Sequence, residues 1–262
     1  MEKRERHFVL VHGPCHGAWC WYKVATLLRS AGHRVTALDL AAAGVNGKRL
    51  DELNSISDYY EPLIEFMTSL VTGEKVILVA HSMGGISASV AMERFPQKIS
   101  VAVFVAALMP GPDFNLPILV IQELHQKNLG AFMDGQYTFD RGPNNPPTSL
   151  IYGPEYLAAK LYQLSPPEDL TLATMLMRPI KLFNGENLLK ETTVTREKYG
   201  TVRRVYIVCD KDNVLEEDFQ RWMIKNNLTD EVKVILGSDH MPMFCKPLEL
   251  CAYLQEIVES YS

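Results

Sequence analysis

The stretch Val76–Gly85, Val-Ile-Leu-Val-Ala-His-Ser-Met-Gly-Gly, constrains the fold of this chain more than any other. Residues 76–81 are mostly apolar and do not alternate, which predicts a strand buried on both faces of a parallel sheet. Ser82 follows among small residues, and residues 86–94 are typical of a helix. A serine at the apex of a sharp strand-to-helix turn is a nucleophile elbow. The following helix would present N–H groups and partial positive charge beside the hydroxyl.

The usual Gly-x-Ser-x-Gly pattern of such an elbow reads Ala80-His-Ser-Met-Gly84 here. The turn needs small residues two positions from the serine, and alanine is the smallest departure from glycine. The motif alone leaves open that Ser82 is an ordinary serine in a strand–helix turn. The strand before it and the helix after it favour the elbow.

Strands and helices alternate through the first hundred residues and again after residue 202. Strands are predicted at residues 7–11, 34–40, 76–81, 98–108, 204–209 and 231–236, and helices at 19–31, 57–72, 86–94, 215–226 and 247–260. Such alternation predicts an α/β fold with a mostly parallel, doubly wound sheet and helices on both faces.

Between these two parts the composition changes. Ten of the fifteen prolines lie between residues 110 and 180, with helical patches at 118–128, 154–163 and 168–177 between them. The segment is too apolar for a linker. We therefore expect residues 110–201 to form a cap inserted into a core made of residues 1–109 and 202–262. Apolar walls in a cap favour an apolar substrate.

Composition narrows the classes of function. The net charge is −5, the pI is about 5.8 and no block is basic, which argues against nucleic acid or an anionic membrane as a partner. No signal peptide or membrane-spanning run is visible. The five cysteines are an odd number without metal-ligand spacing and are typical of reduced thiols in a cytoplasmic protein. We expect neither a metal nor a cofactor.

A serine nucleophile needs a base, and the base needs an orienting carboxylate. Ser82, the loop carrying Asp210 and Asp212, and His240 each follow a predicted strand, in the chain order of α/β-hydrolases. His240 is therefore the best base among the seven histidines. Spacing does not decide between Asp210 and Asp212. We interpret Asp39 and Asp239 as aspartates that bond loop backbone.

An oxyanion hole needs two backbone N–H donors. Met83 follows the nucleophile and should supply one, and the loop at residues 12–17 should supply the other. Pro14 lies in that loop and has no N–H. If Pro14 occupies the donor position, the missing bond costs on the order of 10²–10³ in rate. The alternative, that Cys15 N–H or a water fills the place, stays open.

Several stretches resemble the plant methylesterase family of α/β-hydrolases, which includes methyl salicylate and methyl jasmonate esterases and the hydroxynitrile lyases. They are His7–Gly13, Cys15–Trp21, Ala80–Gly85, Val205–Cys209, Phe219–Trp222 and Asp239–Met241. Three further stretches resemble most the polyneuridine aldehyde esterase branch, which works on alkaloids: Leu38–Asn46, Asp58–Pro62 and Lys98–Phe104.

The resemblance implies a role for each matching residue. Ser82 matches the nucleophile, His240 the base and Asp212 the triad acid, while Met83 matches one oxyanion donor and Pro14 falls on the position of the other.

We also expect five residues around the triad to contact the substrate: Gly13, His81, Phe132, Met133 and Met241. The lyase branch carries a threonine at the position of Gly13 and a lysine at that of Met241. Both departures favour an esterase over cyanohydrin cleavage.

The sequence thus predicts hydrolysis of a small plant methyl ester, with an indole alkaloid ester that then loses CO₂ as one candidate. Two alternatives remain: a non-hydrolytic lyase or alkaloid-rearranging enzyme on the same scaffold, for which Pro14 is the motive, and a ligand-binding receptor with little turnover. The expected partner is the small-molecule ester, and a homodimer is left open.

Overall fold

The computed structural model describes residues 5–114, 129–183 and 186–261 of the chain. The helical patch expected at 118–128 lies outside the described residues.

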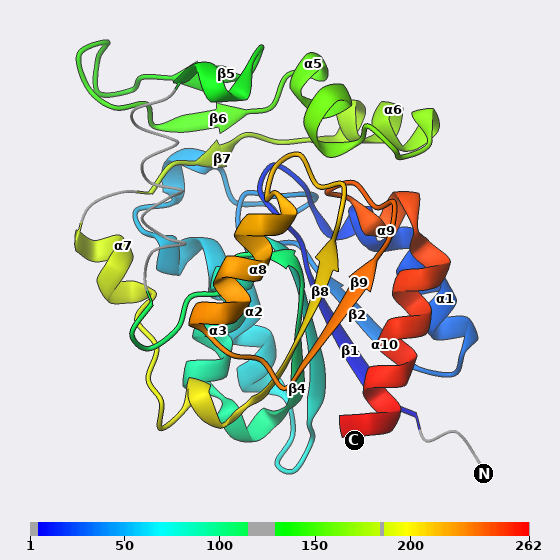
Figure 1. Cartoon of the computed structure of the whole chain (residues 1–262). Helices are drawn as coiled ribbons and strands as arrows, with labels where there is room; N and C mark the ends of the chain where they lie inside the picture. Colours follow the sequence, from blue (N-terminus) through cyan, green and yellow to red (C-terminus); the bar gives the residue numbers. More distant parts are fainter. Residues whose placement is uncertain (1–4, 115–128, 184–185, 262) are drawn as a thin grey trace.

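A six-stranded parallel sheet forms the centre of the molecule (Figure 1). Its strands lie in the order β2 (Arg34–Leu38), β1 (His7–Val11), β3 (Val76–Ser82), β4 (Ile99–Ala107), β8 (Arg203–Cys209) and β9 (Glu231–Ile235). The prediction of a doubly wound α/β sheet is confirmed. The strand order reverses between β1 and β3, and ligands of such sheets bind beyond the carboxyl ends of the strands at this reversal.

Burial follows position in the sheet. Every residue of β1 and β3 is buried, and so are all but one of β4, whereas the edge strands β2 and β9 carry exposed positions. Parallel strands covered on both faces lose their alternation for this reason. The unbroken apolar run before Ser82 therefore reflects a central place in the sheet.

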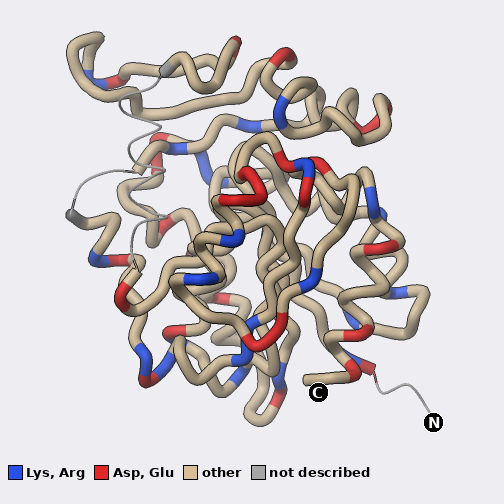
Figure 2. The backbone as a smooth tube through the Cα atoms, in the orientation of Figure 1, with Lys and Arg blue, Asp and Glu red and all other residues tan. Residues whose placement is uncertain are grey.

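Helices cover both faces. On one side α1 (Tyr22–Ser30) packs against α10 (Pro247–Tyr261), and on the other α2 (Ile56–Ser69), α3 (Gly84–Arg94) and α8 (Glu217–Asn226) lie over β3, β4 and β8 (Figure 1). The helix predicted at 19–31 begins instead as a 3₁₀ turn, η1 (Ala18–Trp21), whose first N–H group is bonded by the Asp39 carboxylate. Figure 2 shows both signs of charge scattered over the described backbone.

The segment between β4 and β8 carries a second, smaller sheet that the sequence did not reveal. Its elements are β5 (Gln136–Thr138), β6 (Ser149–Ile151), α5 (Pro154–Tyr156), the π-helical turn η5 (Leu157–Leu161), α6 (Pro167–Leu176), β7 (Ile180–Lys181) and α7 (Glu186–Glu191). The three strands pair antiparallel in the order β5-β6-β7. Strands of two or three residues are too short to show a period of two, so only helical patches were predicted.

In Figure 1 the small sheet, α5 and α6 lie beyond the carboxyl ends of the core strands. We propose that residues 110–201 form a cap over a core made of residues 1–109 and 202–262. Short elements complete the chain: η2 (Leu50–Glu52), η3 (Pro96–Lys98), η4 (Leu129–Phe132), η6 (Tyr199–Thr201) and α9 (Pro242–Cys245).

The start of α3 has no room for side chains. A Cβ added to Gly85 would lie 2.0 Å from the Leu108 carbonyl oxygen, and one added to Gly84 would lie 2.6 Å from that of His12. Both obstacles are backbone atoms of neighbouring strand ends, which cannot step aside as a flexible side chain would. These glycines let α3 sit directly against the ends of β1 and β4.

We expect Gly85→Ala to destabilise the protein by about 3 kcal/mol or more, because the new methyl group overlaps the Leu108 carbonyl. For a chain of this size that is a fall of roughly 6 °C or more in thermal midpoint. Gly47→Ala is the matched control, since nothing lies within 4 Å of a Cβ there. Equal midpoints for the two variants would contradict the close approach.

Candidate active site

Ser82 ends β3 with a backbone φ of +55°, in the left-handed region that residues with a Cβ seldom adopt. Met83 is the N-cap of α3, so the free N–H groups of that helix begin beside the serine hydroxyl. Strain of this kind persists only where the surrounding packing imposes it. The expected strand, sharp turn and helix are all present.

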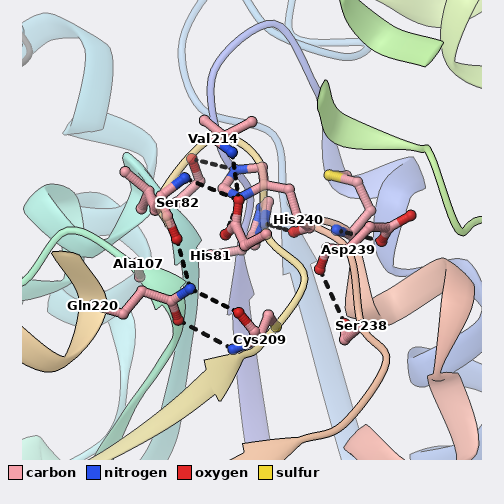
Figure 3. A network of polar contacts seen from close by, with 12 residues as sticks. His81, Ser82, Ala107, Cys209, Val214, Gln220, Ser238, Asp239 and His240 are labelled. Atoms are coloured by element: carbon pink, nitrogen blue, oxygen red, sulfur yellow. Dashed lines mark hydrogen bonds and ion pairs between the residues drawn. The ribbon is translucent and has the colours of Figure 1, made fainter. Parts of the chain in front are cut away.

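The three residues of the predicted triad come together from three strand ends. Figure 3 shows two of them, Ser82 and His240, next to each other. His240 Nε2 lies 3.0 Å from Ser82 Oγ, and His240 Nδ1 lies 2.7 Å from Asp212 Oδ2. Because an ionised carboxylate only accepts, Nδ1 carries the proton and Nε2 can accept the serine proton. The other oxygen, Asp212 Oδ1, accepts the N–H groups of Val214 at 2.7 Å and Leu215 at 2.9 Å. All three triad side chains are buried.

The structure separates the two aspartates that spacing could not. Asp210 Oδ1 accepts the N–H groups of Gly237 and Ser238. Although burial raises it, the pKa of the Asp210 carboxyl is lowered overall by the Lys211 ammonium and by these two bonds. Asp210 ties the loop after β8 to the loop after β9. Asp212, two residues further on, is the carboxylate that meets His240.

The other two aspartates bond loop backbone, as interpreted from the sequence. Asp39 accepts the N–H groups of Ala18 and Val45. Asp239 accepts the N–H of Met241 at 2.9 Å and two further donors from the cap segment.

Gln220 supports the acid loop and had no sequence signal. Its side-chain oxygen accepts the Cys209 N–H at 3.1 Å, and its amide nitrogen donates to the carbonyls of Cys209 and Leu215 (Figure 3). These bonds close the turn that carries Asp212. A helical glutamine offers nothing in sequence to separate this role from an ordinary surface position.

His81 lies beneath the base. Its Nε2–H donates to the His240 carbonyl at 2.7 Å, and the two ring centroids are 4.6 Å apart. Burial, together with the neighbouring His240, holds the pKa of His81 well below its ordinary value. A neutral ring here fixes the backbone of His240 without adding charge. His81 therefore supports the base and does not line the cavity.

The first loop passes close to the nucleophile. A Cβ on Gly13 would lie 2.8 Å from Ser82 Cβ and 3.2 Å from His81 Nδ1, so this position excludes a side chain. Pro14 and Met83 line the cavity beside Ser82. Of these two, only Met83 has a backbone N–H.

A cavity of about 180 Å³ opens above Ser82. Phe132, one of the expected substrate contacts, lines it, and it stacks on Tyr152 and packs against Tyr156, which line it too. The described lining also includes Leu108, Lys160, Asn213 and Val214. A larger hollow at the opposite edge of the sheet contains Glu74, whose carboxylate pairs with Arg34 and lies 3.0 Å from His7 Nδ1.

Four of the five expected substrate contacts, Gly13, His81, Met133 and Met241, are not among the described lining residues. Met133 is 47% exposed and Met241 is fully buried, and neither belongs to the described lining. Sequence reasoning missed Tyr152 and Tyr156, because neither the stretch around Tyr152 nor the helical patch at 154–163 says which side chains face the cavity. Val214 could have been found, because it follows the triad acid by two residues.

The described residues contain no group of three or more side chains that could hold a metal ion. All five cysteines are free thiols. Among the helices of the described segments, none has the length and apolar character needed to cross a bilayer.

Four buried histidines make stability depend on pH. Burial lowers the pKa values of His7, His12 and His81, and it lowers that of His16 to about 3, from an ordinary value of 6.5. The unfolded chain therefore binds more protons below pH 6.5, and stability falls as pH drops. His16 alone accounts for about 2 kcal/mol between pH 7 and pH 5.

We expect thermal midpoints to fall from pH 7 to pH 5. In His16→Gln the fall should be smaller, because about one proton fewer is taken up on unfolding. Glutamine keeps a donor and an acceptor but does not titrate. Identical slopes for wild type and variant would mean that His16 is protonated in the folded state.

The comparisons with known proteins agree with this geometry. Residues 8–252 match the model of the alpha/beta hydrolase family. The chain is 85% identical over 262 residues to methyl jasmonate esterase 1 of Vitis vinifera, covering all of both proteins. It is 46% identical to polyneuridine aldehyde esterase of Rauvolfia serpentina, over 98% of this chain and 97% of that protein.

Among solved structures, tomato methylketone synthase I complexed with 2-tridecanone superposes with a TM-score of 0.93 at 48% identity. The match covers 99% of this chain and all of that one. Fold, site geometry and relatives agree. The chain belongs to the alpha/beta hydrolase family and, within it, to the plant methylesterases.

Proposed function

We propose that this protein hydrolyses the methyl ester of a small plant metabolite through an acyl-enzyme on Ser82. The observation that carries the proposal is the continuous hydrogen-bonded row from Ser82 Oγ through His240 to Asp212. It supplies a nucleophile, a base within reach of its proton and a carboxylate that orients the base.

The steps follow from this row. His240 Nε2 takes the Ser82 proton while Oγ attacks the ester carbonyl, and the Met83 N–H donates to the oxyanion. The tetrahedral intermediate collapses, and His240 returns the proton to the departing methanol. Water then attacks the acyl-enzyme with His240 as base, releasing the acid and freeing Ser82. Asp212 stabilises the imidazolium throughout.

Methyl jasmonate is the substrate that we favour. Its support is the 85% identity to the Vitis enzyme, well above the 46% to polyneuridine aldehyde esterase. The cavity suits a small ester with an apolar body, because Phe132, Leu108 and the side chains of Tyr152 and Tyr156 form its walls.

We also propose a cytoplasmic location, since free cysteines are typical of a reducing compartment. A homodimer remains a proposal.

We expect the purified protein to release the free acid and methanol from methyl jasmonate in preference to methyl salicylate or an indole alkaloid methyl ester. Ser82→Ala should lower kcat by ~10³ or more. Mass spectrometry of the products measures both. Ser260→Ala, an exposed serine near the end of α10, is the control. Turnover that survives in Ser82→Ala would refute the mechanism.

A second candidate is a non-hydrolytic reaction on the same scaffold, such as loss of CO₂ from a β-keto acid. Pro14 favours it, because a cavity with a proline at one donor position stabilises an oxyanion less well. Release of CO₂ without methanol would support it. A receptor role would need tight binding with no product, and the complete triad argues against it.

We expect Pro14→Ala to raise kcat for ester hydrolysis, because alanine restores a backbone N–H beside Met83. One added donor is worth up to ~10² in rate. Pro143→Ala, in an exposed loop, should leave kcat unchanged. If Pro14→Ala hydrolyses esters no faster than wild type, the second donor already comes from Cys15 N–H or a water.

A further inference from the structure

One stretch of the cap, residues 159–165, reaches all three loops that carry the active site. We call this stretch the brace. It contains the end of the π-helical turn η5 and the turn that leads into α6. In Figure 1 the chain between α5 and α6 lies beyond the ends of β8 and β9.

The brace holds the first loop through Tyr162. The Tyr162 hydroxyl lies 2.7 Å from His16 Nε2, and His16 Nδ1 lies 2.8 Å from the Pro14 carbonyl oxygen. A carbonyl only accepts, so Nδ1 carries the ring proton and donates it to the Pro14 carbonyl. Nε2 of the buried neutral ring accepts a hydrogen bond from the Tyr162 hydroxyl. The phenol thereby fixes the ring that holds Pro14 beside the nucleophile.

The brace holds the acid loop on both sides of Asp212. Gln163 Nε2 donates to the Lys211 carbonyl at 2.6 Å, and Asn213 Nδ2 donates to the Ala159 carbonyl at 3.2 Å. Lys211 and Asn213 are the immediate neighbours of the carboxylate that orients the base.

The brace also holds the base loop, through Asp239. Asp239 Oδ2 accepts the Leu164 N–H at 2.9 Å and the Ser165 hydroxyl at 2.8 Å, while Oδ1 accepts the Met241 N–H. Residues 239 and 241 flank His240 in the chain, and Figure 3 shows Asp239 beside it. Asp239 is fully buried, so it depends on these donors for solvation.

We propose that the brace is a positioning element that sets the relative places of nucleophile, base and acid, with Tyr162 and Ser165 as positioning residues that do not touch substrate. The proposal rests on the proposed function of the same triad. Its physical basis is that a misplacement of about 1 Å between reacting groups can cost ~10²-fold in rate. The cap then contributes to the chemical step as well as to the cavity wall.

The cap offers a matched control elsewhere. Asp169 of α6 accepts the Tyr22 hydroxyl at 3.0 Å and pairs with Lys23 at 2.5 Å. These bonds join cap to core but touch none of the three catalytic loops. Tyr22→Phe therefore removes the same atom as Tyr162→Phe from a bond of the same kind.

The test is the rate at which a fluorophosphonate probe labels Ser82, followed by intact mass, because this reaction reports the serine whatever the natural ester. We expect Tyr162→Phe combined with Ser165→Ala to lower kinact by about tenfold or more, with KI within twofold of wild type. Tyr22→Phe should leave both constants unchanged, and Ser165→Thr alone, which keeps the hydroxyl whose proton Asp239 accepts, should label at nearly the wild-type rate.

Two results would overturn the proposal. One is an unchanged kinact in the double variant. The other is a lower kinact accompanied by an equal loss in Tyr22→Phe, which would indicate general loosening of the cap; thermal midpoints of both variants are compared alongside. A wild type that labels at Ser82 but hydrolyses no methyl ester would refute the proposed function and leave the positioning test intact.

Discussion

The strained backbone of Ser82 is the constraint on which the site depends. A φ of +55° at a residue with a Cβ costs on the order of 1–3 kcal/mol, and the structure must supply it through packing. The packing that offsets this strain lies at the start of α3, where Gly84 and Gly85 let the helix pack against the His12 and Leu108 carbonyls. Because α3 packs against the ends of β1 and β4, it fixes the backbone of Ser82 and directs its first N–H groups toward the serine hydroxyl.

The parallel sheet brings the three triad residues to one place. Ser82, Asp212 and His240 are spread over more than half of the chain, yet each follows a strand whose carboxyl end meets the same edge. The reversal of strand order between β1 and β3 leaves a gap in the helical cover at that edge. The Gly13 loop and the elbow lie close together at that edge, and we propose that the cap covers them.

This architecture explains what the sequence could and could not reveal. Buried central strands and the order of serine, aspartate and histidine leave a signature, so the fold, Ser82 and His240 were predictable from the residues, while Asp212 was implied only by the resemblance to the methylesterases. Asp210 and Asp212 are two residues apart in one loop, so spacing along the sequence does not tell which of them meets His240. The short strands β5 to β7 lack a period, and the wall formed by Tyr152 and Tyr156 lacks a motif. Contacts such as Gln163 to the Lys211 carbonyl end on main chain, where sequence carries no information.

The loop around Pro14 connects the nucleophile with the cap. Proline fixes its own φ, and Cys15 follows with a φ of +62°, the combination of a type II turn in which glycine would be usual at the second place. The strain at Cys15 is offset by the cap: Arg178 N–H donates to its carbonyl, and its thiol donates to the Leu150 carbonyl. Proline has no N–H to donate and makes the loop rigid, and cap and loop form one hydrogen-bonded unit. A motion that lifts this part of the cap from the sheet must therefore also release the loop beside the nucleophile.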